Sequence, residues 1–221
     1  MSVHDYEYEW DSRYCYPNSN VLKNKFGITN GKALAVAERE ITAVTIAGIT
    51  EKPVRGKLNF KHLCDIHRAI FRDIFDWAGK PRTVNISKGN PFCMSHVIPD
   101  YAEGLFAELK NEDFLLGKSP DEIPERLTYY LSEINVLHPF REGNGRTQRA
   151  FIKYLAQSAG YNVDFSDVSA DEMIKASVLS FDKDYAMMTA MFKRITSSIT
   201  QQEQQEFRRK IGISRPKSQI G

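Results

Sequence analysis

Twelve consecutive residues, from His138 to Arg149, combine side-chain types that suit chemistry on phosphate groups. Histidine titrates closest to neutral pH of all side chains, so His138 suits the role of a general base. Glu142 is the carboxylate of the segment, and Mg²⁺ is usually held by one or two carboxylates together with substrate oxygens. Gly143 and Gly145 allow successive backbone N–H groups to face one anion. The segment therefore predicts a phosphate-transfer site.

Two arginines follow at a spacing that places both on one face of a helix. Arg146 and Arg149 are three residues apart, and each guanidinium can grip phosphate oxygens through a fork of N–H donors. We group Arg141 with them as a candidate phosphate ligand. The structural alternative is a glycine turn beside a histidine that packs or caps a helix. That alternative explains His138 alone, but it does not explain the whole combination.

Apolar residues on both sides of this segment predict the helices that position it. Upstream they recur at three- and four-residue spacing, as on one buried helix face: Leu127, Leu131, Ile134 and Leu137. Downstream the pattern continues to a stop at Gly160, with Phe151, Ile152, Leu155, Ala156 and Ala159. The reactive segment is thus a loop between two core helices. Its glycines lie where the second helix begins, and helix N-termini attract anions.

The segment matches, at every specified position, the motif His-Pro-Phe-x-(Asp/Glu)-Gly-Asn-Gly-Arg-x-x-Arg of the Fic family, which this chain resembles. Residues 73–79, Asp-Ile-Phe-Asp-Trp-Ala-Gly, also resemble that family, and the similarity extends over residues 10–197. The resemblance implies an all-α fold, a helical bundle around a central helix–loop–helix active site with a small β-hairpin. It also implies an enzyme that transfers AMP from ATP to a Ser, Thr or Tyr hydroxyl of a target protein.

The resemblance assigns a role to each residue of the motif. His138 would deprotonate the target hydroxyl, and Glu142 would bind the Mg²⁺ cofactor. Asn144 and the backbone amides of Gly143 and Gly145 would hold the α-phosphate of the co-substrate ATP, while the two motif arginines would hold its β/γ end.

Residues 80–93 predict a hairpin in an otherwise helical chain. The stretch from Thr83 to Ser87 alternates like a strand, residues 88–90 form a turn, and residues 91–93 return. In the Fic family the corresponding hairpin, the flap, covers the active site and pairs with an extended target segment, which is strand addition. The resemblance therefore implies target docking on Thr83, Val84, Asn85, Ile86, Ser87 and Lys88.

Periodicity and capping residues predict the remaining helices. We expect a short helix at Val21–Phe26, one with apolar positions from Leu34 to Ala47, and a long one that Asn59 caps. Further helices should start at Asp100 and at three cap residues: Ser119, Ser169 and Asp182. His62 and His67 are five residues apart on the long helix, so we expect surface or capping positions for both.

The two ends of the chain differ in composition from its middle. Residues 1–20 are predicted to form a strap over the domain through the aromatic residues Tyr6, Tyr8, Trp10, Tyr14 and Tyr16. Residues 1–197 form the predicted domain, strap included. Residues 198–221 are polar and basic, and predict a solvated helical extension or a linker.

Composition excludes several classes of function. The 221 residues carry a net charge of +2, which gives no electrostatic case for binding nucleic acid or a membrane surface. The three cysteines, Cys15, Cys64 and Cys93, fit neither a disulfide framework nor a zinc site. We find no signal peptide and no apolar run long enough to cross a bilayer, so we expect a cytoplasmic protein, unless it is translocated into a host cell.

The partners follow from the resemblance and from one missing motif. Many Fic proteins carry an inhibitory helix, (Ser/Thr)-x-x-x-Glu-(Gly/Asn), whose Glu pairs with the second motif arginine, yet no Ser or Thr here has Glu four residues later. We therefore expect a toxin restrained by a separate small helical antitoxin that supplies this Glu to Arg149. Expected targets are a type II topoisomerase or, for a host-directed effector, a small GTPase. Alternatives are a nucleotide-binding recruitment module and transfer of UMP or phosphocholine.

Overall fold

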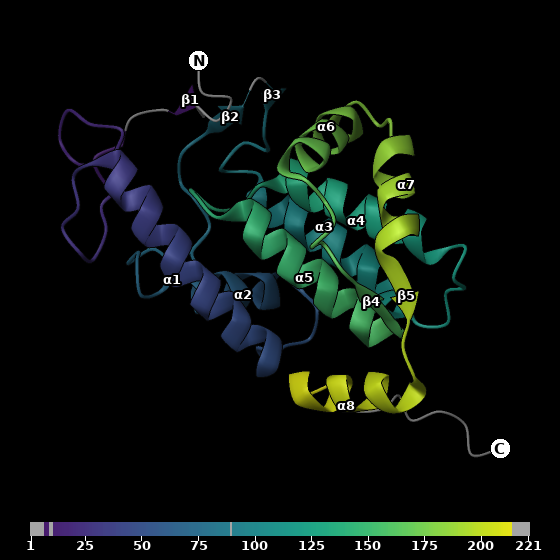
Figure 1. Ribbon diagram of the computed structural model, residues 1–221. Coiled ribbons are helices and arrows are strands. Elements are labelled where there is room, and N and C mark those ends of the chain that lie inside the picture. Colours follow the sequence, from purple (N-terminus) through teal and green to yellow (C-terminus); the bar gives the residue numbers. More distant parts are fainter. Residues whose placement is uncertain (1–6, 9–10, 89, 214–221) are drawn as a thin grey trace.

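The computed structural model describes residues 7–8, 11–88 and 90–213, and within them the chain is mostly helical (Figure 1). Its helices are α1 (Gly31–Glu51), α2 (Phe60–Phe71), α3 (Ile98–Asn111), the short 3-10 helix η1 (Asp113–Leu115), α4 (Ile123–Leu137), α5 (Asn144–Ala159), α6 (Ala170–Phe181), α7 (Ala186–Ile195) and α8 (Gln201–Ile211). Its strands are β1 (Glu7–Tyr8), β2 (Ile86–Lys88), β3 (Asn90–Pro91), β4 (Tyr161–Val163) and β5 (Thr196–Ser198). The all-α expectation is confirmed.

Helices α4 and α5 form the centre of the bundle, with α1 and α2 on one side and α6 and α7 on the other (Figure 1). The apolar faces expected from the sequence are buried: Leu127, Ile134 and Leu137 on α4, and Phe151 and Leu155 on α5, are fully inaccessible to solvent. Burial of each such side chain favours folding by about 1.5–3 kcal/mol. The loop between α4 and α5 is therefore held by the two most buried elements of the fold.

The predicted cap at Asn59 is confirmed, and two of the helices begin a few residues away from their predicted caps. Asn59 caps α2 through a bond from the His62 amide to Oδ1 of 3.0 Å, as expected. Ser119 and Glu122 exchange side-chain bonds, but α4 begins only at Ile123. Asp182 ends α6, and Asp184 takes the expected place before α7 by accepting from the Ala186 amide at 3.1 Å.

The predicted short helix at Val21–Phe26 is wrong. The side chain of Asn24 donates to the carbonyls of Leu22 and Ile28, at 3.0 and 2.7 Å, and its Oδ1 accepts from the Ile28 amide at 3.0 Å. These bonds satisfy the backbone in a turn, which competes with helix formation, as is common for asparagine.

Residues 196–211 pack on the bundle instead of leaving it. Strand β5 pairs antiparallel with β4, which follows α5, and α8 then lies across one end of the bundle against α5 (Figure 1). Phe207 and Ile211 are buried, and Arg208 Nη1 donates to Ser158 Oγ at 3.0 Å. The expected solvated extension is thus a packed helix over residues 201–211, while residues 214–221 lie outside the described part. No described helix combines the length and apolar character needed to span a membrane.

Candidate active site

The loop between α4 and α5 is shaped by two left-handed residues. His138 ends α4 with a φ of 41°, and its amide donates to the Ile134 carbonyl at 3.0 Å. Gly143 stands immediately before α5 with a φ of +81°, and a β-carbon there would come within 2.2 Å of the Phe71 ring. Glycine is therefore required at 143 for two reasons, backbone conformation and space. The chain leaves α4 at His138 and enters α5 directly after Gly143.

The imidazole of His138 is buried and oriented. Its Nδ1 lies 3.1 Å from the Asn135 carbonyl oxygen, which can only accept, so Nδ1 carries the proton. In that tautomer Nε2 is the basic nitrogen. The ring stacks on Phe92, which follows β3, with centroids 3.7 Å apart. The His138 ring is therefore held in a fixed orientation, and the flap supplies the surface against which it packs.

Asn144 holds the loop in shape. Its Oδ1 accepts from the Phe140 amide at 2.9 Å, and its Nδ2 donates to the Phe140 carbonyl at 2.7 Å. The side chain is buried, and both of its polar atoms serve the loop backbone. Any contribution of Asn144 to phosphate binding thus comes from its backbone N–H, at the first position of α5.

Glu142 lies in the loop two residues before α5 and is partly buried. Its Oε1 accepts from the Gly143 amide at 2.9 Å and lies 3.6 Å from Arg146 Nη2. A partly accessible carboxylate beside a helix N-terminus fits a Mg²⁺ that takes its remaining ligands from substrate phosphates and water. No cluster of three acidic, His or Cys residues that could hold a metal occurs within the described residues, so a metal here would depend on the substrate.

Arg146 is tied to helix α1. Its guanidinium donates to Glu38 and, at 3.0 Å, to Thr42 Oγ1, and it lies over the Phe71 ring at 4.8 Å. Burial raises the pKa of Glu38, Arg146 opposes that shift, and Glu142 adds to it. Sequence reasoning missed Glu38 because it lies 108 residues before its partner, without a local motif.

Arg149 has different surroundings. Burial lowers its pKa, and the neighbouring positive charge of Arg146 lowers it further. No acidic side chain pairs with it in the part of the chain that the structure describes. Its Nη1 would lie 3.4 Å from a β-carbon at Gly145, which places the guanidinium beside the first turn of α5. Positive charge from the arginine and from the helix N-terminus therefore meets at one place, as an anion site requires.

Arg141 contacts the N-terminal segment of the chain. It is buried, its Nη2 lies 3.6 Å from Cys15 Sγ, and its guanidinium lies 5.9 Å from the centroid of the Tyr14 ring. These contacts connect the motif loop to the N-terminal segment. The expected role of Arg141 as a phosphate ligand stays a prediction. Tyr14 and Cys15 are buried, whereas Tyr6 and Trp10 lie outside the described residues, so the strap over residues 1–20 stays a prediction.

His67 bonds the backbone of the motif loop from a buried position, which corrects the expectation of a surface or capping position for this residue. It is fully buried, its Nδ1 accepts from the Gly79 amide at 2.8 Å, and its Nε2 donates to the Glu142 carbonyl at 3.0 Å. Burial lowers its pKa to about 3, so the ring is neutral. His62 is also fully buried, and bonds the backbone of Val54 and Leu58.

Arg82 connects the flap to the catalytic loop. Its Nε donates to the His138 carbonyl at 2.9 Å, Nη1 donates to the Val84 carbonyl at 2.6 Å, and Nη2 donates to the Cys93 carbonyl. Its amide donates to the Pro139 carbonyl at 2.7 Å. Burial lowers the pKa of this guanidinium to about 10. One buried arginine thus joins both ends of the hairpin to the histidine backbone, and no sequence motif marks it.

The flap has the expected hairpin but a shorter strand. Ile86–Lys88 pairs with Asn90–Pro91, while Thr83 to Asn85 precede the strand. Val84 and Ile86 are buried, whereas Thr83 and Asn85 are exposed, so the predicted alternation holds.

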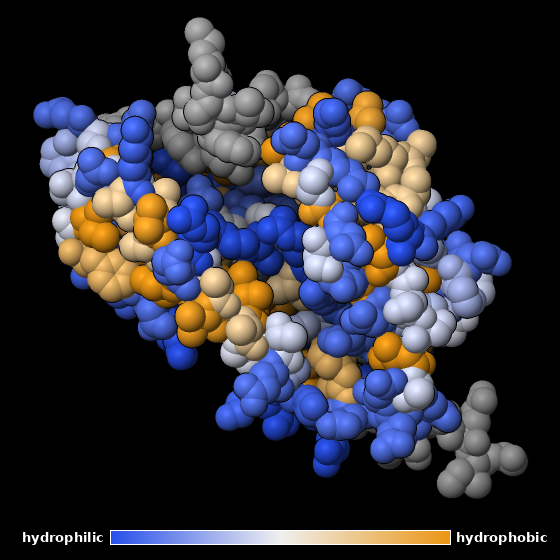
Figure 2. Space-filling model, in the orientation of Figure 1, coloured by the Kyte–Doolittle hydropathy of each residue, from blue (hydrophilic) through white to orange (hydrophobic). Residues whose placement is uncertain are grey.

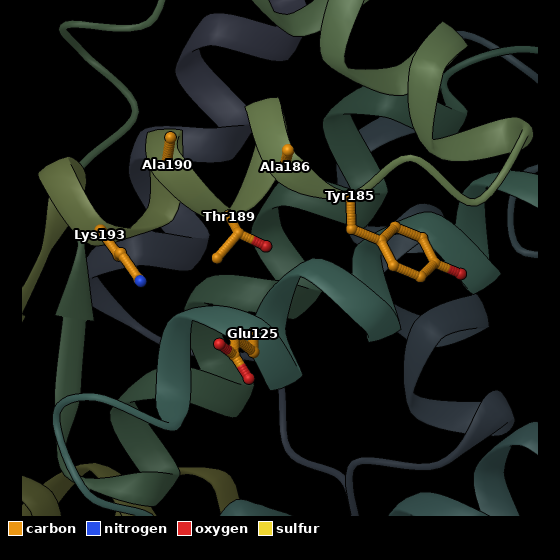
Figure 3. Close-up of a pocket in the computed structure, with 6 residues that line it drawn as sticks. All are labelled: Glu125, Tyr185, Ala186, Thr189, Ala190 and Lys193. Atoms are coloured by element: carbon orange, nitrogen blue, oxygen red, sulfur yellow. The ribbon is translucent and has the colours of Figure 1, made fainter.

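The surface agrees with this location of the site. Figure 2 shows a hollow lined by hydrophilic residues between α1 and α6, over the start of α5. A second hollow, of about 470 Å³, lies between α4 and α7 and shares no residue with the motif (Figure 3). It is lined by Glu125, Tyr185, Ala186, Thr189, Ala190 and Lys193. Of these two hollows, the first lies over the start of α5, where the motif loop ends.

Residues 57–156 match the Fic/DOC family model. The probable protein adenylyltransferase Fic of Salmonella typhimurium is 38% identical over 192 residues, which cover 86% of this chain and 94% of that protein. The protein adenylyltransferase VbhT of Bartonella schoenbuchensis is 36% identical over 188 residues, 85% of this chain and 39% of that protein. The crystal structure of the BepC protein of Bartonella tribocorum with bound AMPPNP has a TM-score of 0.80 at 26% identity, and covers 86% of this chain and 99% of that one. The chain belongs to the Fic/DOC family.

Proposed function

We propose that this protein is an adenylyltransferase that transfers AMP from ATP to a Ser, Thr or Tyr hydroxyl of a target protein and releases pyrophosphate. The proposal is supported by the loop between α4 and α5, which begins at an imidazole whose Nε2 is the basic nitrogen and ends at the N-terminus of α5, where the Arg149 guanidinium also lies. The names of the relatives and the AMPPNP bound to BepC support the same reaction.

The residues of the chain account for the movement of the proton and the phosphoryl group. His138 Nε2 takes the proton of the target hydroxyl, whose oxygen forms a bond to the α-phosphorus. The bond from that phosphorus to the β-phosphate oxygen breaks, and pyrophosphate leaves with its electron pair. The backbone N–H groups at the start of α5 hold the α-phosphate, and Arg149 holds the β/γ end. General-base help contributes about 10²–10⁴ in rate, and positioning supplies most of the remainder.

Glu142 is the residue that would hold Mg²⁺. Its carboxylate is a hard oxygen ligand, and a single carboxylate suffices when phosphate oxygens and water complete the shell. When bound, the ion would offset negative charge between the phosphates. The remaining electrostatic stabilisation comes from the chain itself, through the arginines and the amides of α5.

The flap is the proposed docking site for the target. An extended target segment would pair with the backbone of β2, which fixes the hydroxyl near His138 with few demands on the target sequence. Phe92 of the same hairpin packs on the His138 ring, so docking and catalysis share one element. A type II topoisomerase is the proposed target of a toxin, and a small GTPase is the target of a host-directed effector.

A separate small helical protein is the proposed restraint. Helix α1 exposes Val36 and Val44, at 50% and 74% of their surface, on the helix that also carries Glu38 into the site. Such apolar residues suit a helical partner that lays its own apolar face beside α1. A Glu from that partner would pair with Arg149 and would repel the γ-phosphate.

The proposal is tested with ATP labelled at the α-phosphate. The purified protein should label at least one protein in a bacterial lysate, and His138→Ala should not. Mass spectrometry of the product should show the added mass of AMP, which separates this donor from UMP and phosphocholine. The absence of label at all magnesium concentrations would overturn the proposal. A nucleotide-binding recruitment module would instead keep both its ATP affinity and its biological effect in His138→Ala.

A further inference from the structure

The flap strand β2 is paired on both of its edges. On one edge it pairs antiparallel with β3 of the hairpin, and on the other with β1 from the N-terminal segment. The register places Glu7 opposite Ser87 and Tyr8 opposite Ile86. Figure 1 shows these three strands together at one end of the molecule. The backbone groups that an incoming strand would need on β2 are thus occupied by the chain itself.

The outer edge of β3 is less suited than the edge of β2 to pairing with an incoming strand. The Phe92 amide points inward, toward the Ile86 carbonyl at 3.3 Å. Because successive residues of a strand alternate in direction, the amide position of residue 91 points outward. That residue is a proline and has no N–H to donate. The β2 edge is therefore the better template for strand addition.

The segment that carries β1 is anchored close by. The Tyr14 hydroxyl accepts from the Thr83 amide at 3.2 Å, and the Tyr14 ring packs edge-on against Trp77. The next residue, Cys15, contacts Arg141 of the motif loop at 3.6 Å. The chain is thus held at the flap only a few residues after β1. Such a short tether gives β1 an effective concentration at the flap in the millimolar range.

We infer that β1 is an in-chain competitor of the target: it occupies the flap edge on which the target strand must pair, and the target displaces it on docking. The inference rests on the proposed function and adds a regulatory element to it. A strand of two residues forms few hydrogen bonds, so its release is easy and the restraint is partial. The apparent affinity for the target falls by the fraction of molecules whose edge is open. We expect the attached strand to raise the apparent KM for the target about tenfold and to leave kcat unchanged.

A reversible cross-link tests this inference in the full chain. Glu7→Cys combined with Ser87→Cys places two cysteines at paired backbone positions, where Cα atoms are about 4.5–5.5 Å apart and a disulfide can form. The oxidised form should label lysate proteins at least tenfold more slowly than the same protein after reduction. The affinity of the two forms for a fluorescent ATP analogue should agree within about twofold. Each single cysteine variant controls for disulfides with Cys15, Cys64 or Cys93.

Deletion of residues 1–8 provides a second test, because it removes β1 and keeps the Tyr14 anchor. It should increase labelling at low lysate concentration and leave it unchanged at saturation. Equal labelling by the oxidised and reduced forms, or slower labelling after the deletion, would overturn the inference, because β1 would then be neutral or part of the docking surface. If the reduced form labels nothing, the proposed transferase activity itself fails, and this outcome is distinct from the others.

Discussion

Arg141 and Arg149 belong to one motif but have opposite surroundings, and this contrast can be measured. Arg149 lies beside the first turn of α5 without an acidic partner among the described residues, whereas Arg141 contacts Tyr14 and Cys15. Hydrogen bonds to charged groups contribute about 1.5–3 kcal/mol, so Arg149→Ala should weaken ATP binding about 10- to 100-fold. Arg141→Ala, the matched control, should leave ATP affinity within about twofold and lower the free energy of unfolding. Calorimetric titration with ATP distinguishes them, and equal losses of affinity would identify Arg141 as a phosphate ligand as well.

His67 makes the stability of the protein depend on pH. Burial lowers its folded pKa to about 3, while the unfolded side chain titrates near its ordinary value of 6.5. Between pH 3 and pH 6.5 the unfolded state binds a proton that the folded state does not bind. The neutral, buried ring therefore costs no stability above pH 6.5, and the protein loses stability as the pH falls below that value. One such group contributes at most about 1.4 kcal/mol per pH unit to the slope. Urea unfolding of His67→Gln at pH 5, 6 and 7 should show a shallower loss than the wild type.

His62→Gln is the matched control for this histidine. Burial also lowers the pKa of His62, but its ring bonds Val54 and Leu58, and not the motif loop. Both variants should therefore flatten the pH dependence, and only His67→Gln should also slow AMP transfer. An unchanged slope in His67→Gln would mean that this histidine titrates in the folded state near its ordinary value.

Glu38 illustrates a functional contact that need not stabilise the fold. Burial raises its pKa above the ordinary 4.5, despite the opposing effect of Arg146. The folded state therefore binds the proton more tightly, and the wild type loses stability as the pH rises through the raised value. Glu38→Gln should gain stability relative to the wild type between pH 4 and pH 7, as seen by urea unfolding. It should still slow AMP transfer, because Arg146 loses one of its two charged partners and keeps only Glu142. A gain in both properties would contradict a positioning role for Glu38.

At the scale of elements, the position of the flap relative to the motif loop depends on a single residue, Arg82. Arg82 bonds the carbonyls of Val84, Cys93 and His138, and a lysine cannot reach three such acceptors with one ammonium group. Arg82→Lys should therefore slow the labelling of target proteins about tenfold or more, while ATP affinity changes less than about twofold. The exposed Arg72→Lys is the control. Equal losses in target labelling and ATP affinity would show that Arg82 supports the whole site and not the flap.

At the scale of elements, local patterns predicted local structure and little beyond it. The spacing of apolar residues identified the buried faces of α4 and α5, and the motif located the loop between them, because these features repeat within one or two helical turns. The two-residue shift from Asp182 to Asp184 before α7 shows how nearby cap candidates compete. Burial of Phe207 and Ile211 could not be read from a segment dominated by polar residues.

At the scale of the whole molecule, the supports of the site come from distant parts of the chain. Glu38 on α1, His67 on α2 and Arg82 before the flap meet the motif loop through contacts that span 108, 75 and 56 residues. None has a sequence signature, because each is defined by the packing of helices that bring it to the loop. The pairing of β1 with the flap arises in the same way. The position of the motif loop between two buried helices was thus predictable from the sequence, and the distant residues that contact this loop were not.

Whether the protein is active when it is expressed without a partner also depends on contacts across the whole molecule. Within the described residues, no carboxylate pairs with Arg149, so no described acidic side chain would compete with the γ-phosphate for this arginine. Induced expression of the wild-type chain in bacteria that contain its target should stop growth, and His138→Ala should not. Equal growth with both, at equal expression, would mean that the chain restrains itself. The deletion of residues 1–8 would then locate the restraint: arrest by the deleted chain alone would assign it to β1, and continued growth would place it elsewhere in the fold.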